Sequence, residues 1–456
     1  MVDRRIRYYT IVNCSIICLL AIFIACGEVE TKWIRKFEAA GPGDYRINSM
    51  VCSREDIYLT GKYVGPDDRT ACFVARYDKA GSLVWHQTYE APENLQAAGR
   101  EILITITQKE LISAHIDIYV LTETQDAEGV KGAVLLKYDT LGNIKWERTA
   151  TSNKGSLMST LLSDFEGNLY LAGWEAPSEA EPTISITKFS ESGEILWFTK
   201  YYNKELDFSD LRFHIMEPEV FVVAGMLKST NEIFYMKYDG SGHLRGITKY
   251  AAGTQVKALS GMLTAHTGHV FMTANIANAE TGDDFLTLAY DNTDSLLWAN
   301  EYDGEARLAD MSSAISVDES LNVYVTGTTE NAEGVPNIVT AKYNKSGNRL
   351  WVQSLRQNKR TQSLLMEPRY IRTAQRRPHL SYLYIAGTIG DDGLILRCNT
   401  NGVYSFQAHY GEKGSKTIPT VLTEKCLALQ RTRNNRSEAL ITKLGPSAIL
   451  GIARWD

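Results

Sequence analysis

The chain has 456 residues, of which 44 % are hydrophobic and 22 % are charged, and its formal net charge is −6. This balance is typical of a folded globular protein and excludes a disordered or collagen-like chain, and the acidic charge excludes a general nucleic-acid binder. Its 24 Tyr, 13 Phe and 8 Trp, set against only 11 Pro, favour β-structure.

The first 25 residues have the order of a bacterial export signal. Three Arg between positions 4 and 7 precede an apolar stretch from Ile11 to Ala25, which is shorter than the roughly 20 residues of a membrane-spanning helix. The stretch leads into Cys26 and resembles a bacterial lipobox, although Phe23 stands where Leu is usual. The resemblance implies cleavage before Cys26 and lipidation of its thiol. An uncleaved N-terminal anchor and an ordinary signal peptide cut elsewhere are the alternatives.

A lipidated Cys26 predicts a protein of the bacterial cell envelope that is held on a membrane by its N-terminal lipid. Gly27, where an Asp would indicate retention, favours the outer membrane, and the side that the protein faces is left open. Such a compartment permits disulfides, but the four remaining cysteines are too few for a disulfide framework. We interpret them as buried strand residues, with room for one bridge. They are Cys52, Cys72, Cys398 and Cys426.

One phrase recurs along nearly the whole chain. A basic residue, an aromatic residue and Asp or Asn are followed by Gly, then Trp, and then another aromatic residue, as in Arg76-Tyr77-Asp78…Gly81…Trp85…Tyr89. Successive Trp positions of the repeat, with Gly246 counted as one of them, are 49 to 61 residues apart. The fourth copy has Gly246 in place of Trp, and the fifth has Asp294 in place of Gly. The copies after the first begin at Lys137, Lys188, Lys237, Tyr290, Lys342 and Arg397.

Each repeat predicts four short strands. A second phrase, clearest as Asn322-Val323-Tyr324-Val325-Thr326-Gly327, precedes each copy, and a further apolar stretch precedes that phrase. Continuous apolar runs of this length are typical of strands covered on both faces. The Asp-x-x-Gly step predicts a turn with a left-handed Gly, and the Trp of the following strand can seal one unit against the next. Four-stranded units in radial array form a β-propeller.

The repeat count predicts an all-β fold, a β-propeller of eight four-stranded blades. There are eight middle hairpins, of which the last joins Cys426–Arg431 to Ala439–Leu444, and Trp33–Phe37 supplies the eighth last-strand phrase. The N-terminal strand is therefore expected to complete the C-terminal blade and close the ring, which removes the exposed sheet edges. In the alternative, Ile449–Trp455 forms the outer strand of that blade. Degenerate repeats leave seven blades as the other possibility.

These repeats resemble a bacterial β-propeller repeat family called SBBP, with its pattern D-x-x-G-N-x-Y-V-x-G followed by K-Y-[DN]-x-x-G-x-x-x-W. The resemblance covers roughly residues 33–445, and it implies the fold while saying little of function. A weaker similarity of layout is to the propeller lipoprotein of the outer-membrane barrel-assembly machinery. On this basis the chain divides into a signal peptide at 1–25, a tether at 26–32 and a single propeller domain at 33–456.

No residue pattern in the sequence indicates a catalytic or metal site, and we expect no cofactor. The Asp-x-x-Gly…Trp spacing differs from the Asp box of sialidase propellers, and the adjacent Cys pair of quinoprotein dehydrogenases does not occur. His266 and His269 are the only close His pair, and two ligands are too few for zinc. The stretches 164–168 and 318–322 look faintly like calcium loops but lack alternating oxygen ligands, which favours turns.

Charge is unevenly distributed along the chain. Residues 342–377 hold ten Lys or Arg and a single acidic residue, Glu367, whereas most loops between second and third strands are acidic, including those around Glu175 and around Asp283 and Asp284. The basic stretch is a candidate contact for an anionic partner, with a merely solvated face as the alternative. The candidate contact residues are Arg356, Lys359, Arg360, Arg376 and Arg377.

Together these features predict a non-enzymatic, lipid-anchored binding module or scaffold for a protein or glycan partner at the cell envelope. A rigid ring of blades offers loop-built surface on two faces to such a partner. The alternative is a carbohydrate-active hydrolase or lyase whose site lies at the central channel. That activity requires carboxylates from several blades to converge within about 5–10 Å.

Overall fold

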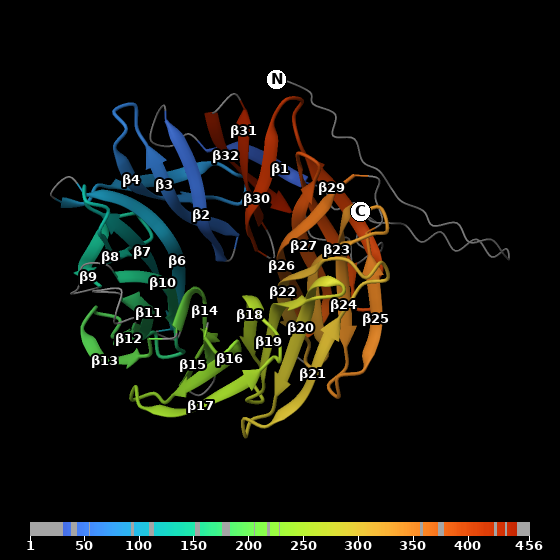
Figure 1. Cartoon of the computed structure of the whole chain (residues 1–456). Coiled ribbons are helices and arrows are strands. Elements are labelled where there is room, and N and C mark those ends of the chain that lie inside the picture. Colours follow the sequence, from blue (N-terminus) through green and yellow to red (C-terminus); the bar gives the residue numbers. More distant parts are fainter. Residues whose placement is uncertain are drawn as a thin grey trace.

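The protein is an eight-bladed β-propeller, as the repeat count predicts. The computed structural model describes residues 31–37, 43–53, 55–92, 95–108, 114–150, 156–175, 183–204, 206–216, 219–227, 229–355, 359–372, 378–423, 426–433 and 436–444. Its strands form eight four-stranded antiparallel sheets that follow one another around a ring (Figure 1). Within the described residues, no helix is long and apolar enough to cross a membrane.

The first four blades each use four consecutive strands. Blade 1 contains β2 (Asp44–Ser53), β3 (Asp56–Val64), β4 (Thr70–Tyr77) and β5 (Leu83–Tyr89). Blade 2 contains β6 (Gln96–Gln108), β7 (Ala114–Gln125), β8 (Lys131–Tyr138) and β9 (Ile144–Thr149). Blade 3 contains β10 (Ser156–Ser163), β11 (Leu169–Glu175), β12 (Thr183–Phe189) and β13 (Ile195–Tyr202). Blade 4 contains β14 (Leu206–Met216), β15 (Val220–Leu227), β16 (Glu232–Tyr238) and β17 (Leu244–Ala251).

Blades 5 to 7 follow the same plan, and blade 8 draws one strand from the N-terminus. Blade 5 contains β18 (Val256–Thr264), β19 (Val270–Asn278), β20 (Gly282–Tyr290) and β21 (Leu296–Tyr302). Blade 6 contains β22 (Asp310–Val317), β23 (Val323–Glu330), β24 (Pro336–Tyr343) and β25 (Arg349–Ser354). Blade 7 contains β26 (Thr361–Arg372), β27 (Pro378–Ile389), β28 (Asp392–Asn399) and β29 (Tyr404–Tyr410). Blade 8 contains β30 (Lys416–Leu422), β31 (Cys426–Arg433), β32 (Arg436–Leu444) and β1 (Thr31–Lys36).

The first strand of each blade lines the centre of the ring, and the last lies at its circumference. First strands of neighbouring blades contact one another all the way round, from β2 and β6 to β30 and β2. Middle strands such as β4 are buried on both faces, whereas outer strands such as β5 are mostly exposed. Burial on both faces explains why the sequences of the middle strands are unbroken apolar runs.

Antiparallel pairing gives the ring two distinct faces. The turns that join first to second and third to fourth strands lie on one face, which we call the turn face. The loops that join second to third strands, together with the connectors between blades, lie on the other, which we call the connector face. Every first strand therefore begins at the connector face.

The predicted Asp-x-x-Gly turn is confirmed in detail. In blade 2, Asp139 accepts hydrogen bonds from the backbone N–H groups of Leu141 and Asn143, both at 2.9 Å. Gly142 has a φ of 87°, a left-handed conformation that a residue without Cβ adopts at little cost. Asp294, in the same position of blade 5, has a φ of 66°, as expected for a residue type that tolerates this region.

The repeated Trp joins neighbouring blades at the turn face, in five joints that the structure describes. The indole Nε1–H of Trp85 in blade 1 donates to the carbonyl of Thr140 in blade 2 at 2.9 Å, and a Cβ on Gly142 would lie 2.9 Å from the indole ring. The guanidinium of Arg76 donates to the same carbonyl at 3.0 Å. The same Trp–carbonyl bond recurs from Trp146 to Glu191, Trp197 to Gly240, Trp298 to Lys345 and Trp351 to Thr400.

The joint between blades 4 and 5 is built differently. Gly246 stands where the Trp should be, and the turn that it would cover carries Asp294 where other blades have Gly. The Asp294 carboxylate pairs with Lys237 of blade 4, whose side chain is 10 % exposed, and it accepts a hydrogen bond from Tyr235 of the same blade at 2.9 Å. The two departures from the repeat thus compensate each other, with an ion pair in place of an aromatic contact.

The N-terminal strand closes the ring, as predicted. β1 pairs antiparallel with β32, in the register Ile34–Thr442, and lies at the outer edge of blade 8 (Figure 1). Phe37 is 1 % exposed and stacks on Phe73 of blade 1 with ring centroids 4.5 Å apart. Because β1 occupies this edge, the alternative in which Ile449–Trp455 forms the outer strand is wrong. That segment and Cys26 lie outside the described residues.

The exceptional joint leads to a stability prediction. Asp294→Gly should lower the free energy of unfolding by about 3 kcal/mol, because it leaves the buried Lys237 without its carboxylate. Adding Gly246→Trp should recover at least half of this loss, since the indole can then cover a glycine turn as it does at the other joints. Urea denaturation of both single variants and the double variant measures the coupling. Purely additive effects of the two substitutions would show that the positions do not compensate each other.

Candidate functional site

A cavity of about 520 Å³ lies at the inner wall of blades 1 to 3. Its lining comes from the first strands β2, β6 and β10 and from the end of β7, so it opens at the connector-face end of the channel. Four of its side chains are charged, two Arg and two Glu. The lining residues are Arg46, Asn48, Ser49, Ala98, Gly99, Arg100, Glu101, Glu123 and Ser159.

A repeated β-bulge places side chains in this cavity. The register shifts by one residue between Ile47 and Ser49 in β2, and equivalent shifts occur in β6 and β10. The extra residues at these three bulges are Asn48, Arg100 and Ser159, and all three line the cavity. A bulge re-aims the side chain that it inserts. The same backbone irregularity thus presents a different chemical group from each blade.

The strands around the cavity are held closely together. The side-chain amide of Asn48 donates to the carbonyl of Gly99 at 2.8 Å, and the backbone N–H of Ile102 donates to Ser49 Oγ at 3.2 Å. A Cβ on Gly99 would lie 1.9 Å from Thr60 Oγ1 in blade 1, so any side chain there would separate β6 from β3. The wall of the cavity is therefore fixed by contacts between blades.

The four charged groups have unequal environments. Arg100 Nη1 lies 3.0 Å from Glu123 Oε2, and Lys131 Nζ lies 2.9 Å from Glu123 Oε1, so Glu123 sits between two cations. Arg46 is exposed to the channel and forms no ion pair with any residue that the structure describes. Arg46 thus offers its guanidinium to a bound molecule.

Glu101 has the most perturbed carboxyl group of the cavity. Its Oε2 accepts a hydrogen bond from the backbone N–H of Leu161 in blade 3 at 2.6 Å. Burial raises the pKa of Glu101 to about 7, against the opposing effects of this bond and of the nearby Arg100 charge. A carboxyl group with a pKa near neutrality, in the same cavity as the ion-paired Glu123, can exchange a proton with a bound ligand.

The basic residues singled out in the sequence are only partly within the described structure. Lys359 and Arg360 are exposed in the connector between β25 and β26, and the carbonyl of Arg360 accepts a hydrogen bond from Gly390 N at 2.9 Å. Arg356, Arg376 and Arg377 lie outside the described residues. The anionic contact therefore stays a prediction, and this stretch contributes no residue to the cavity.

Two of the acidic residues noted in the connector-face loops are buried. Glu175 is 5 % exposed and pairs with Lys200 at 2.7 Å, and Asp284 is 1 % exposed. Among the described residues, Asp284 belongs to the one acidic cluster close enough to hold a metal ion, with Asp303 and Asp310. The loops that look faintly like calcium sites are turns, as predicted: Asp318, for example, caps the N–H groups of Ser320 and Asn322.

The raised pKa of Glu101 predicts a pH-dependent stability. Because the folded protein holds this proton more tightly than the unfolded chain, the group stabilises the fold below about pH 4.5, and that stabilisation is lost as the pH rises through 7. Glu101→Gln removes the titration but keeps an oxygen for Leu161 N. From pH 5 to pH 8 the variant should therefore gain about 2 kcal/mol relative to wild type. Urea denaturation across this range measures the free energy of unfolding, with the exposed Glu333→Gln as control. A difference between Glu101→Gln and wild type that did not change with pH would contradict the raised pKa of Glu101.

Comparison with known proteins adds structural neighbours but no family. No family model and no curated protein matches the chain. A mutant of the Synechocystis apocarotenoid oxygenase is 9 % identical, with a TM-score of 0.44 over 90 % of this chain and 98 % of its own. Drosophila Plexin A, solved with Semaphorin 1b, is 9 % identical, with a TM-score of 0.41 over 92 % and 88 %. A Bacteroides caccae protein of unknown function is 13 % identical, with a TM-score of 0.34 over 62 % and 89 %.

Proposed function

We propose that the protein is a lipid-anchored binding module of the bacterial cell envelope, which holds a glycan or a segment of a protein partner in the cavity of blades 1 to 3. The observation that carries this proposal is the cavity itself, about 520 Å³ in volume and lined by Arg46, Arg100, Glu101 and Glu123. Its volume lies in the range of small-molecule sites. Charged and amide groups on its wall suit hydroxyl groups or peptide bonds rather than an apolar ligand.

The rigidity of the ring supports a binding role. Each side chain of the cavity stands on a strand that is hydrogen-bonded within its blade and packed against the next blade. A partner therefore meets donors and acceptors that are already in place, and binding requires little ordering of the protein. Arg46, exposed and outside any ion pair with the described residues, supplies the first contact for a partner's carboxylate or carbonyl oxygen.

The proposed anchor gives the ring an orientation. β1 begins beside Leu444, at the end of β32, and so starts at the turn face. Five residue steps separate Cys26 from Thr31, which span at most about 18 Å. Lipid on Cys26 would hold the turn face towards the membrane, where Leu141 and Phe165 are 72 % and 82 % exposed. The connector face, with the cavity, would then point away from the membrane.

A second candidate function rests on Glu101 and Glu123. Glycoside hydrolysis uses one carboxylic acid that is protonated at working pH and one carboxylate. Glu101, with a pKa raised by burial to about 7, fits the first role, and Glu123, paired with Arg100 and Lys131, fits the second. Turnover of an envelope polysaccharide by wild type that is lost in both Glu101→Gln and Glu123→Gln would favour the enzyme over the binding module.

The binding proposal is tested by comparing variants of the lipidated protein in its own envelope. Arg46→Ala combined with Arg100→Ala should reduce the amount of co-purifying glycan or protein at least tenfold. Arg69→Ala, an exposed Arg in a connector-face loop of blade 1, should leave it unchanged. Cys26→Ser should release the protein from the membrane fraction. Equal recovery of partner by the double variant and wild type would remove the cavity from the proposal.

A further inference from the structure

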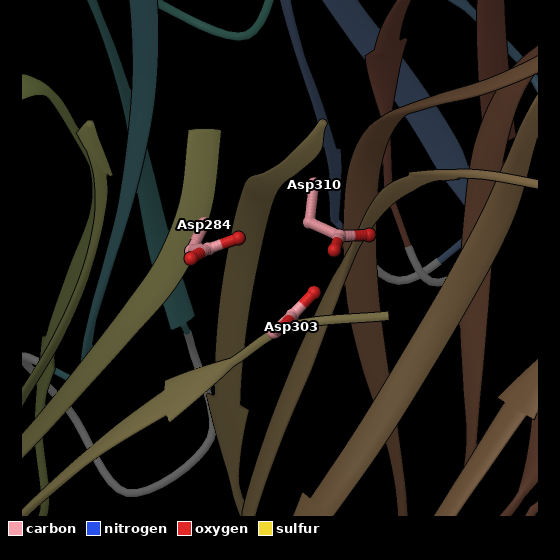
Figure 2. Close-up of side chains that lie close together, drawn as sticks. All are labelled: Asp284, Asp303 and Asp310. Atoms are coloured by element: carbon pink, nitrogen blue, oxygen red, sulfur yellow. The ribbon is translucent and has the colours of Figure 1, made fainter. Parts of the chain in front are cut away.

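Three aspartates from one joint of the ring converge at the connector face. Asp284 lies near the start of β20 in blade 5, Asp303 directly follows β21, and Asp310 is the first residue of β22 in blade 6. One carboxylate oxygen from each lies within 4.8 Å of the other two. Figure 2 shows the three carboxylates directed towards one another. We propose that they bind a divalent cation, for which Ca²⁺ is the best match.

Two buried oxygen atoms in this cluster have no hydrogen-bond partner among the described residues. Asp284 and Asp310 are each 1 % exposed, and the Oδ1 atom of each accepts no hydrogen bond from the residues that the structure describes. Their Oδ2 atoms are held, by Asn278 Nδ2 at 2.7 Å for Asp284 and by Gly304 N at 2.6 Å for Asp310. A buried carboxylate oxygen without a partner is costly, and a bound cation removes that cost.

The protein supplies little positive charge to these carboxylates. No Lys, Arg or His in the described part of the chain forms an ion pair with Asp284 or Asp310. Arg307 lies 3.4 Å from Asp303 and 3.5 Å from Glu280, and its side chain is 66 % exposed, so it neutralises only the solvent side of the cluster. Lys257 pairs instead with the neighbouring Asp283.

The local backbone keeps space open beside the carboxylates. A Cβ on Gly304 would lie 2.9 Å from Asp310 Oδ1 and 2.5 Å from Thr329 Oγ1, so Gly is the residue that leaves this volume free. Ca²⁺ binds oxygen ligands at about 2.3–2.6 Å, so oxygens on opposite sides of the ion are about 5 Å apart, whereas Mg²⁺ requires about 4 Å and stricter octahedral geometry. An all-oxygen cluster whose ligand atoms lie within 4.8 Å of one another satisfies the spacing for Ca²⁺, and the flexible coordination of Ca²⁺ accepts such a cluster more readily than the strict octahedron of Mg²⁺.

The test uses the full mature protein after treatment with EDTA. Titration calorimetry should detect one Ca²⁺ site, and about 1 mM Ca²⁺ should raise the melting temperature by several degrees, with a smaller effect of Mg²⁺. Asp284→Asn combined with Asp310→Asn should abolish both responses, and Glu333→Gln, an exposed acidic residue of the same face, should keep them.

Asp303→Asn is a further variant that should fold like wild type, because this side chain is partly exposed and lies outside the core. It should weaken Ca²⁺ binding at least tenfold. The proposal is overturned if wild type shows no binding of either cation, as expected if Asp284 and Asp310 share a proton instead. It is equally overturned if the double Asn variant binds Ca²⁺ as wild type does.

A second inference rests on the seam between blades 8 and 1. Cys52 in β2 and Cys426 in β31 are 374 positions apart in the chain, yet their Sγ atoms are 3.3 Å apart. Cys426 is fully buried, and both side chains pack in one hydrophobic cluster with Phe37 and Phe73. We infer that this pair forms a disulfide bond that locks the ring.

The reaction needs only a small movement. The two thiols lose two protons and two electrons to dioxygen or, by exchange, to another disulfide, and the sulfur atoms approach by roughly 1.3 Å to reach a bond length of about 2.0 Å. The other two described cysteines are unsuited to disulfide formation. Burial raises the pKa of Cys72 and raises that of Cys398 to about 12, and these two lie in different blades. We therefore expect both to stay thiols.

Peptide mapping of the mature protein tests this bond. The protein is equilibrated with oxidised glutathione, unfolded without reductant and treated with iodoacetamide. Cys72 and Cys398 should be alkylated, and the peptides of Cys52 and Cys426 should be linked. Dithiothreitol should lower the melting temperature of wild type by several degrees but leave that of Cys52→Ser unchanged. Alkylation of all four cysteines, or an equal effect of dithiothreitol on both proteins, would overturn the inference.

Discussion

The contact between a tryptophan of one blade and a glycine turn of the next is the interaction on which the ring depends. At the first joint, Trp85 and Arg76 both donate to the carbonyl of Thr140, so a single backbone oxygen ties two strands of blade 1 to blade 2. Gly142 makes this approach possible because it has no Cβ to meet the indole and because its φ is positive. One residue type thus satisfies two independent conditions, which is why the repeat is so clear in the sequence.

The joint between blades 4 and 5 indicates what the contact requires. With Gly246 in place of Trp, the space where the indole would begin is open, and Asp294 joins the two blades through its ion pair with Lys237. An aromatic ring on glycine and a partly exposed ion pair both connect one blade to the next. The condition is therefore that the turn face of the joint carries a contact between blades and that the basic residue has a partner, and more than one pair of residues meets it.

The sequence predicts those parts of the molecule that repeat and fails for those that do not. Strand order, turn conformation and closure by β1 follow from a phrase that recurs in every blade. The cavity combines Arg46, Glu101 and Glu123 from separate positions with no common pattern. Asp284 was expected in an acidic loop, although it lies near the start of the buried third strand of its blade. Asp303 reaches it from the end of β21 in the same blade, and only Asp310 is brought to it by the packing of blade 6 against blade 5.

The repeating and the non-repeating parts differ because the Trp contacts between blades lie on one side of the ring. The Trp contacts use the turn face and the outer strands, so they place no demand on the inner strands or on the connector face. At the inner strands, one bulge geometry inserts Asn48, Arg100 and Ser159 from successive blades. Changing a bulge residue alters the chemistry of the channel without touching the Trp contacts of the turn face, although Asn48 also bonds to the carbonyl of Gly99 in the next blade. A propeller built in this way can vary the groups that line its channel without altering its fold, and in blades 1 to 3 of this chain those groups include two Arg and two Glu.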